Sequence, residues 1–301
     1  MANLAKILKT RHQAEHSAGK LPPLMVAAER VASTVAQGVH GRRRVGQGDS
    51  FWQFRRFGAS DAAQQIDWRQ SAKSDHLYVR ETEWEAAQSV WLWRDGSGSM
   101  DYRSARNLPT KAERAELLLL AMAALLVRGG ERIALLESSA RPASGRAALE
   151  RITLSLVGPL AGAEASAIRN SLPPFVPLPR YGQLFVIGDF LSPLEEIDAI
   201  VRSYAAQGLK GYVLQVLDPA EESLPFAGRT RFEGLEGEGN LLVRRVETAR
   251  GTYLDRIDAQ IDGLKTLCRR AGWSFGGHRT DRPPESALLG AYMALSATLA
   301  R

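Results

Sequence analysis

Ser-Val-Trp-Leu-Trp-Arg-Asp-Gly-Ser-Gly-Ser-Met, residues 89–100, is the stretch of sequence that decides the fold. Its first half is rich in β-branched and aromatic residues and predicts a strand, which stops at a glycine that permits a sharp turn. Its second half places one carboxylate and two hydroxyls at alternate positions, Asp95, Ser97 and Ser99. A tight loop with this spacing can present three oxygen atoms on one side. We therefore expect a strand followed by a ligand-binding loop.

Downstream of this loop, predicted helices and strands alternate. A helix begins with the capping-box spacing Thr110 to Glu113 and ends at Gly129-Gly130. Further strands are predicted at 132–136, 184–187, 211–217 and 273–275, and further helices at 147–156, 193–207, 253–270 and after Pro283-Pro284. Repeated βα units predict an α/β fold, in which helices cover both faces of a mostly parallel sheet. We expect this domain to span residues 89–301.

Upstream of the strand lie two segments of different character. Residues 1–45 mix helix formers with prolines and predict an N-terminal helical extension, whereas residues 46–88 are dense in Trp, Phe, Arg and Asp and are expected to pack on the core. Within the second block, Asp67, Trp68 and Arg69 combine a carboxylate, a large ring and a guanidinium. They could lock the block onto the sheet through an ion pair and a buried ring, or form a partner-binding surface if they are exposed. Exposure decides between these two roles.

The composition, 45% hydrophobic and 24% charged, is that of an ordinary globular protein. The longest apolar run, residues 117–127, is too short for a membrane-spanning helix, which needs about 20 residues, and residues 1–30 contain no stretch of signal-peptide type. The single cysteine, Cys268, cannot form an intramolecular disulfide and fits a reducing compartment. We therefore expect a cytoplasmic protein without a transmembrane segment.

The formal net charge of +6 favours anionic partners without naming their class. Arginines 42–44 lie near the aromatic stretch 51–54, a combination that could serve single-stranded nucleic acid through phosphate contacts and stacking. No recognisable nucleic-acid-binding signature accompanies it, so a protein partner is preferred and nucleic acid is disfavoured.

Two acidic loops follow predicted strands, where open α/β sheets gather their ligands. The first carries Asp95, Ser97 and Ser99, and the second carries Asp189, which follows Gly188 after the strand at 184–187. These oxygen ligands could converge on one divalent cation, with magnesium the first choice and manganese or calcium as alternatives. The alternative interpretation is a hydrogen-bonded turn whose serines cap the next element.

Two resemblances support the metal interpretation. Residues 95–100, Asp-Gly-Ser-Gly-Ser-Met after a hydrophobic strand, resemble the metal-ion-dependent adhesion site of von Willebrand factor A domains. The motifs at 56–61, 65–73 and 77–81 resemble the signature of the bacterial domain-of-unknown-function family numbered 58. Together they imply a von Willebrand A-like, Rossmann-type fold and a MoxR-type AAA+ ATPase as the partner in protein or complex maturation.

The resemblance assigns the metal to Asp95, Ser97, Ser99 and Asp189. The threonine that such sites usually place between the two loops is not obvious in this sequence. Ser144 or Thr153 could substitute, although Thr153 falls in a predicted helix.

Two functions remain open. In the first, the chain is a non-enzymatic interaction module whose bound cation leaves one coordination position open for an acidic residue of a partner. In the second, Asp95 and Asp189 hold magnesium in a phosphoryl-transfer or hydrolytic enzyme. The sequence shows no complete catalytic constellation, and Gly96-Ser97-Gly98-Ser99 is out of register for a Gly-x-Ser-x-Gly nucleophile elbow. We therefore assign no catalytic residue.

Overall fold

The computed structural model describes residues 26–36, 45–58, 64, 66–74, 76–83, 88–138, 140–157, 170–237 and 239–298. The chain divides into two units, one of Met1–Ala36 with Gln88–Arg301 and one of Gln37–Ala87. Most of the expected N-terminal extension, 1–45, and parts of the expected block 46–88 lie outside the described residues. The division into 1–45, 46–88 and 89–301 stays a prediction.

A five-stranded parallel sheet forms the centre of the larger unit, in the order β4-β3-β5-β6-β9. Its strands are β3 (Ser89–Arg94), β4 (Arg132–Leu135), β5 (Gln183–Gly188), β6 (Lys210–Leu217) and β9 (Ser274–Arg279). Because β4 lies on one side of β3 and β5 on the other, the strand order reverses between β3 and β5. Open α/β sheets bind ligands at such a switch point, outside the carboxyl ends of the strands.

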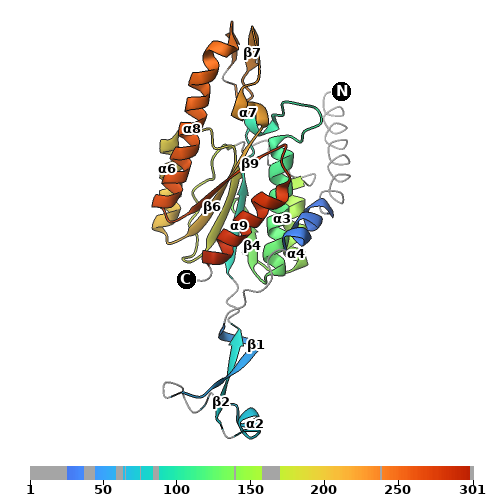
Figure 1. Ribbon diagram of the computed structural model, residues 1–301, viewed down its shortest axis with the longest axis vertical. Coiled ribbons are helices and arrows are strands. Elements are labelled where there is room, and N and C mark those ends of the chain that lie inside the picture. Colours follow the sequence, from blue (N-terminus) through green and yellow to red (C-terminus); the bar gives the residue numbers. More distant parts are fainter. Residues whose placement is uncertain are drawn as a thin grey trace, which may run out of the picture. The chain divides into compact units, whose positions relative to one another are not determined.

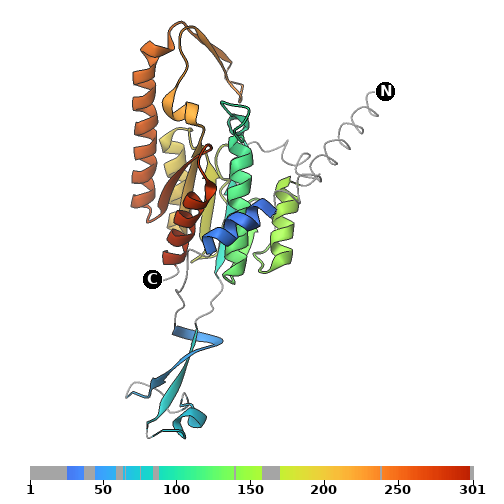
Figure 2. The same cartoon turned by 45° about the vertical axis from the view of Figure 1, so that its right-hand side comes forward.

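Helices cover both faces of this sheet, as Figures 1 and 2 show, with α3 and α9 on one face and α6 and α8 on the other. The longer helices are α3 (Lys111–Arg128), α4 (Arg146–Val157), α6 (Leu194–Ala206), α8 (Val246–Arg270) and α9 (Pro284–Thr298), and the short ones are η2 (Gly98–Asp101) and α7 (Pro219–Ser223). The predicted α/β fold with a parallel sheet is confirmed. The helix at residues 26–36 belongs to the same unit, where Arg128 Nη1 donates a hydrogen bond to Ser33 Oγ at 3.0 Å.

The apolar run of the sequence forms the middle of α3. Residues 118–126 are buried without interruption, because α3 contacts the sheet, α4 and α9. On the other face of the sheet, α6 and α8 close a second apolar layer around Trp91, Trp93 and Trp273. These two layers hold the carboxyl ends of the central strands in fixed positions, because a close-packed core leaves little room for adjustment.

The smaller unit pairs β1 (Val45–Arg56) with β2 (Tyr78–Glu83) in antiparallel fashion. Between them lies the short helix α2 (Trp68–Ser71), whose first turn is capped by Asp67 Oδ1, the acceptor for Gln70 N–H at 2.9 Å. The Trp68 side chain is 65% exposed, and Arg69 is also exposed. Both roles that the sequence leaves open for these residues, packing on the sheet and binding a partner, stay predictions.

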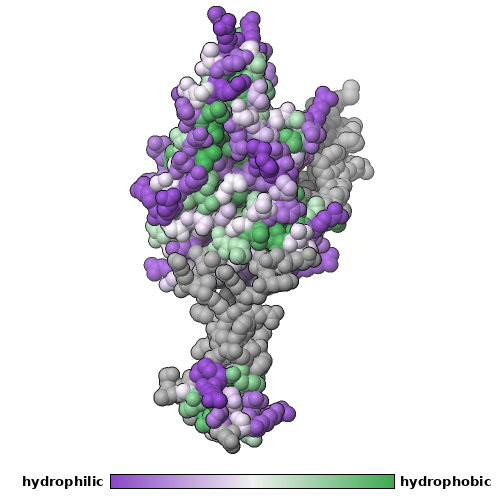
Figure 3. All heavy atoms as spheres, in the orientation of Figure 1, coloured by the Kyte–Doolittle hydropathy of each residue, from purple (hydrophilic) through white to green (hydrophobic). Residues whose placement is uncertain are grey.

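A separate hairpin, not expected from the sequence, leads into α8. Its strands β7 (Thr230–Glu233) and β8 (Asn240–Val243) pair antiparallel to each other and not with the central sheet. Figure 3 shows hydrophilic residues gathered at the end of the molecule where Figure 1 labels β7, whereas Leu241 and Leu242 of β8 are exposed apolar side chains. Nothing in the described part of the chain forms a helix long and apolar enough to cross a membrane.

Candidate functional site

Three neighbouring strands end in an aspartate at the same edge of the sheet. Asp95 follows β3, Asp189 follows β5 and Asp218 follows β6. All three side chains are buried. Parallel strands place their carboxyl ends side by side, so this chain concentrates carboxylates at the switch point of its sheet.

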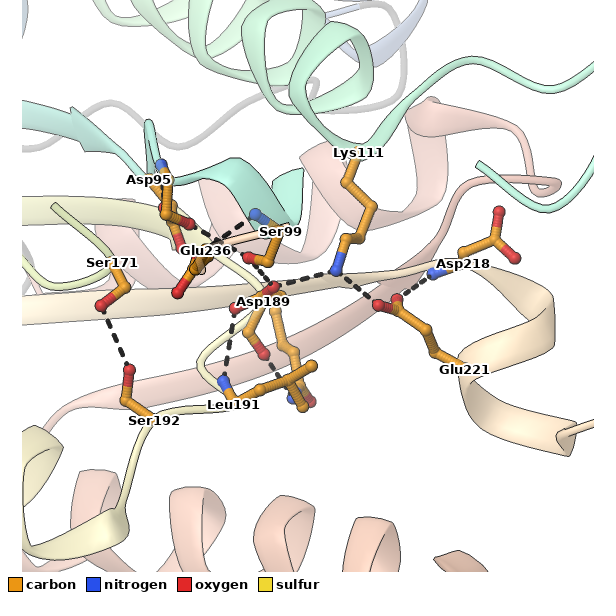
Figure 4. A network of polar contacts seen from close by, with 12 residues as sticks. Asp95, Ser99, Lys111, Ser171, Asp189, Leu191, Ser192, Asp218, Glu221 and Glu236 are labelled. Carbon is orange, nitrogen blue, oxygen red and sulfur yellow. Dashed lines mark hydrogen bonds and ion pairs between the residues drawn. The ribbon is translucent and has the colours of Figure 1, made fainter. Parts of the chain in front are cut away.

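The Asp95 loop folds into a compact network of hydrogen bonds (Figure 4). Ser97 N–H donates to Asp95 Oδ1 at 2.8 Å, and the hydroxyls of Ser97 and Ser99 lie 3.0 Å apart. Ser99 Oγ donates to Asp189 Oδ2 at 2.6 Å, across from the loop after β5. The structure therefore brings the four sequence-predicted residues, Asp95, Ser97, Ser99 and Asp189, into one site.

Asp95 has one carboxylate oxygen without a hydrogen-bond partner. Its side chain is 0% exposed, and Oδ2 is buried away from every donor among the described residues. Burial raises the pKa of this carboxyl to about 7, helped by the nearby charge of Asp189 and only partly opposed by the hydrogen bonds from Ser97. Burying a charge without a partner is unfavourable in free energy, so we expect this oxygen to hold a proton or to bind a cation.

Asp189 is in the opposite situation because the ammonium of Lys111 neutralises it. Lys111 is the first residue of α3 and is 0% exposed, and its Nζ lies 2.9 Å from Asp189 Oδ2 and 2.6 Å from Glu221 Oε1. Burial by itself would lower the pKa of Lys111, but the two carboxylates raise it above its usual value. The lysine is therefore held as a cation.

Sequence reasoning missed Lys111, although one signal was present. A lysine in the first turn of a helix faces the positive end of the helix dipole, which favours carboxylates there instead. Lys111 lies directly after the Thr110 cap of a helix whose middle is apolar. A lysine at this unfavourable position indicates carboxylate partners elsewhere in the fold, which are Asp189 and Glu221.

A further acidic residue reaches the site from the β7–β8 hairpin. Glu236 lies in the turn between the two strands, and its Oε1 accepts a hydrogen bond from Ser99 N–H at 3.1 Å. Its negative charge contributes to the raised pKa of Asp95, after burial and Asp189. No pattern in the sequence connects residue 236 with residue 99, because only the folded hairpin brings them together.

These residues fit a hard divalent cation whose ligands include serine hydroxyls. Asp95 Oδ2 lacks a partner, and the adjoining oxygens of Ser97, Ser99 and Asp189 are of the type that magnesium, manganese and calcium prefer. Among the described residues, no three His, Cys, Asp or Glu side chains converge as a metal-holding group, so the serine hydroxyls would have to complete the ligand set.

The two candidates for the missing threonine lie elsewhere. Thr153 is buried in α4 and donates its hydroxyl to the Leu149 carbonyl at 2.8 Å, so that hydroxyl is used inside its own helix. Ser144 is an exposed residue in the loop before α4. At Asp189, the partners that the structure supplies are Ser99 and Lys111 instead.

The comparisons with known proteins identify a family and distant structural likenesses. The model of the family described as "Protein of unknown function DUF58" matches residues 53–261. Two similar proteins are the uncharacterized protein Rv1480 of Mycobacterium tuberculosis (strain ATCC 25618 / H37Rv) and the uncharacterized protein Mb1516 of Mycobacterium bovis. Each is 26% identical over 224 residues, which cover 70% of this chain and 68% of the relative.

Two solved structures match this chain at a distance. One is an aerotolerance-related membrane protein from Bacteroides fragilis, 16% identical, with a TM-score of 0.38 over 70% of this chain and 100% of that chain. The other is the conserved hypothetical protein BatB from Bacteroides thetaiotaomicron, 17% identical, with a TM-score of 0.38 over 71% of this chain and 100% of that chain. Both likenesses are too distant to indicate a shared function.

Proposed function

This chain belongs to the DUF58 family, and we propose that it is a non-enzymatic protein-interaction module of von Willebrand A-like type with a divalent-cation site. The cation, magnesium in the first place, binds between the Asp95 loop and Asp189. One coordination position remains for an acidic residue of a partner protein. The partner is a MoxR-type AAA+ ATPase, with which the chain acts in the maturation of a protein or complex.

The observation that carries this proposal is the unpartnered oxygen of Asp95. Oδ2 is fully buried, lies at the switch point of the sheet and adjoins the hydroxyls of Ser97 and Ser99. The simple alternative, a turn held by hydrogen bonds alone, would have given this oxygen a donor, because buried polar atoms are nearly always paired. A cation satisfies the oxygen and its charge together.

An enzyme is supported less well by the same geometry. Phosphoryl transfer needs a cationic group that contacts the substrate, and the cation that pairs with Asp189 in the described part of the chain is Lys111. Lys111 is fully buried and already bonds to two carboxylates, so it stabilises the site from within and does not face a substrate.

The test measures binding of a purified MoxR-type AAA+ ATPase to this chain by surface plasmon resonance, in magnesium and in EDTA. We expect binding in magnesium, loss in EDTA and loss in Asp95→Asn, which keeps the size of the side chain and removes the charge. Asp262→Asn changes an exposed aspartate on α8 and serves as the matched control. Equal binding by wild type and Asp95→Asn, with and without EDTA, would contradict the cation-bridge mechanism.

The alternative function, a magnesium-dependent phosphoryl-transfer or hydrolytic enzyme, is tested on the same proteins. Phosphate esters are incubated with the wild type in magnesium, and phosphate release is measured. Turnover that disappears in Asp95→Asn would favour a magnesium-dependent enzyme over an interaction module.

A further inference from the structure

Helix α8 carries apolar and polar side chains on the same face. Residues that recur every three or four positions share this face, at 246, 250, 253, 257, 260 and 264. The apolar members of this set are buried, and the polar members, Arg250, Tyr253 and Gln260, are half-buried. Polar groups on the inner face of a helix need hydrogen-bond partners. All three find them in backbone carbonyls of two loops.

Gln260 holds the loop that follows β5 and begins with Asp189. Its Nε2 donates to the carbonyls of Phe190 and Ser192, at 2.8 Å each. Phe190 has a φ of 49°, in the left-handed region that bulky residues rarely adopt, and its side chain is buried. A backbone of this kind persists only where its surroundings hold it. The two bonds from Gln260 therefore help to fix the loop beside Asp189.

Arg250 and Tyr253 hold a second loop in the same way. The Tyr253 hydroxyl donates to the Glu221 carbonyl at 2.7 Å. Arg250 donates from Nε to the Leu224 carbonyl at 3.0 Å and from Nη2 to the Phe226 carbonyl at 2.7 Å. Leu224 has a φ of 41°, again in the left-handed region. Of the three non-glycine residues with a positive φ in the described part of the chain, two therefore lie in loops that α8 holds.

The two loops meet at Lys111. Its ammonium lies between Asp189 of the first loop and Glu221 of the second, as Figure 4 shows. Helix α8 contacts both α6, which follows the first loop, and α7, which contains Glu221. Arg250 and Gln260 lie about 15 Å apart along the helix, at about 1.5 Å per residue, so they act at two separate points. One helix thus holds both carboxylate partners of one buried lysine.

We propose that α8 clamps the two loops around Lys111, so that they open together and not independently. Gln260 acts on one loop, and Arg250 and Tyr253 act on the other. Releasing one loop removes an anchor of a rigid helix and admits water to a buried ion pair, and both changes weaken the hold on the other loop. A partner that moves α8 would thus act on both carboxylates of Lys111 at once. The clamp does not depend on a bound cation.

The test is native-state hydrogen exchange, measured by NMR in EDTA so that no divalent cation takes part. One reporter is the amide of Leu191, 3.3 Å from Asp189 Oδ1, and the other is the amide of Leu224, which donates to the Ala220 carbonyl at 2.9 Å. Gln260→Met removes both bonds of Gln260 and keeps the length of the side chain. We expect the Leu191 amide to exchange about tenfold faster, as for a lost hydrogen bond. Through the clamp, the Leu224 amide should exchange about threefold faster.

The reciprocal variant is Arg250→Met. We expect the larger acceleration, about tenfold, at Leu224 and the smaller, about threefold, at Leu191. The matched control is Gln207→Met, which changes a glutamine at the end of α6 whose two backbone hydrogen bonds lie outside both loops. We expect this control to change the exchange of both reporters by less than about twofold.

The amides of β6 report global unfolding in the same samples. Faster exchange at both reporters in both variants, with β6 unchanged, supports the clamp. Acceleration confined to the loop that lost its own hydrogen bonds would show two independent anchors and overturn the proposal. If a methionine variant accelerates β6 equally, Tyr253→Phe, which removes a single hydroxyl, decides between these two outcomes in its place.

Discussion

The ends of β3 and β5 are adjacent, and each presents one buried aspartate to the same site, but the two aspartates differ in their partners. Asp189, after β5, accepts from Ser99 and Lys111 through one oxygen. Its other oxygen, Oδ1, lies 3.3 Å from the backbone amide of Leu191. Asp95, after β3, accepts from Ser97 N–H through one oxygen and leaves the other without a donor. Among the described residues, the fold thus supplies a cation to Asp189 and none to Asp95.

This difference shows how a fold can stabilise one half of a polar site and leave the other half dependent on a ligand. On the β5 side, the ion pairs of Lys111 and their hydrogen bonds offset the free-energy cost of burying these charges, so this side needs no ligand. The β3 side needs a proton or a metal. Four substitutions test the contrast, from the largest expected effect to the smallest.

Lys111→Met should have the largest effect on stability. It leaves Asp189 and Glu221 buried without their cation, and removing one partner of a buried ion pair costs about 3–5 kcal/mol. Urea unfolding in EDTA measures the loss. Lys265→Met removes an exposed lysine paired with Asp262 and should change stability by less than about 0.5 kcal/mol. A small loss in Lys111→Met would mean that the β5 side is not stabilised by its ammonium.

Asp95→Asn should change the pH dependence of stability. The pKa of Asp95 is about 7 in the folded chain, whereas its ordinary value, which applies to the unfolded chain, is 3.8. The folded chain therefore holds the proton of this carboxyl more tightly. Ionisation of Asp95 therefore destabilises the folded state progressively as the pH rises from about 4 to about 7. The loss is at most about 4 kcal/mol, at 1.4 kcal/mol per unit of pKa. We expect the asparagine variant to equal the wild type near pH 4 and to exceed it above pH 7.

The measurement is urea unfolding of both proteins in EDTA across this range. His278 must be taken into account, because burial lowers its pKa to about 4 and its contribution stabilises the fold as the pH rises from 4 to 6.5, opposite to Asp95. It is present in both proteins and cancels in their difference. Parallel stability curves for the two proteins would show that Asp95 does not titrate in this window.

Ser99→Ala should have an intermediate effect, because Ser99 joins the two sides. Its hydroxyl donates to Asp189 Oδ2 and adjoins Ser97 Oγ, and hydrogen bonds to charged groups contribute about 1.5–3 kcal/mol. Thermal unfolding measures the loss. Ser155→Ala is the control, since Ser155 donates to a backbone carbonyl on the exposed face of α4. A loss no larger than that of the control would indicate that the two sides are independent.

Thr153→Val should have the smallest effect on the site. The threonine hydroxyl is used by the Leu149 carbonyl within α4, so its removal should leave manganese affinity unchanged within about twofold while lowering stability by about 1 kcal/mol. Calorimetry with manganese provides the measurement. A large loss of manganese affinity would restore Thr153 as the missing threonine of the site.

The sequence predicted the sheet and the aspartate loops well because both depend on local patterns. The run at 89–94 has the composition of a strand, the Thr110 to Glu113 spacing caps α3 as expected, and each aspartate directly follows its strand. A parallel sheet then brings those strand ends together by its topology alone.

The remaining parts of the site depend on contacts between residues far apart in sequence. Lys111 meets Glu221, and Glu236 meets Ser99, through packing that no local spacing encodes. The β7–β8 hairpin was missed because its strands are short, its turn is glycine-rich and its apolar residues face outward, so neither strand shows the alternation of a half-buried strand.

The burial of Lys111 also separates its amine chemically from surface lysines. Acylating reagents attack the neutral amine, but this one is held protonated between Asp189 and Glu221 and is fully enclosed. A half-exposed lysine such as Lys265 is open to such reagents. Acylation of Lys111 therefore requires that α3, β5 and α7 separate, so its labelling rate reports the opening of the site in a chain that carries no engineered probe.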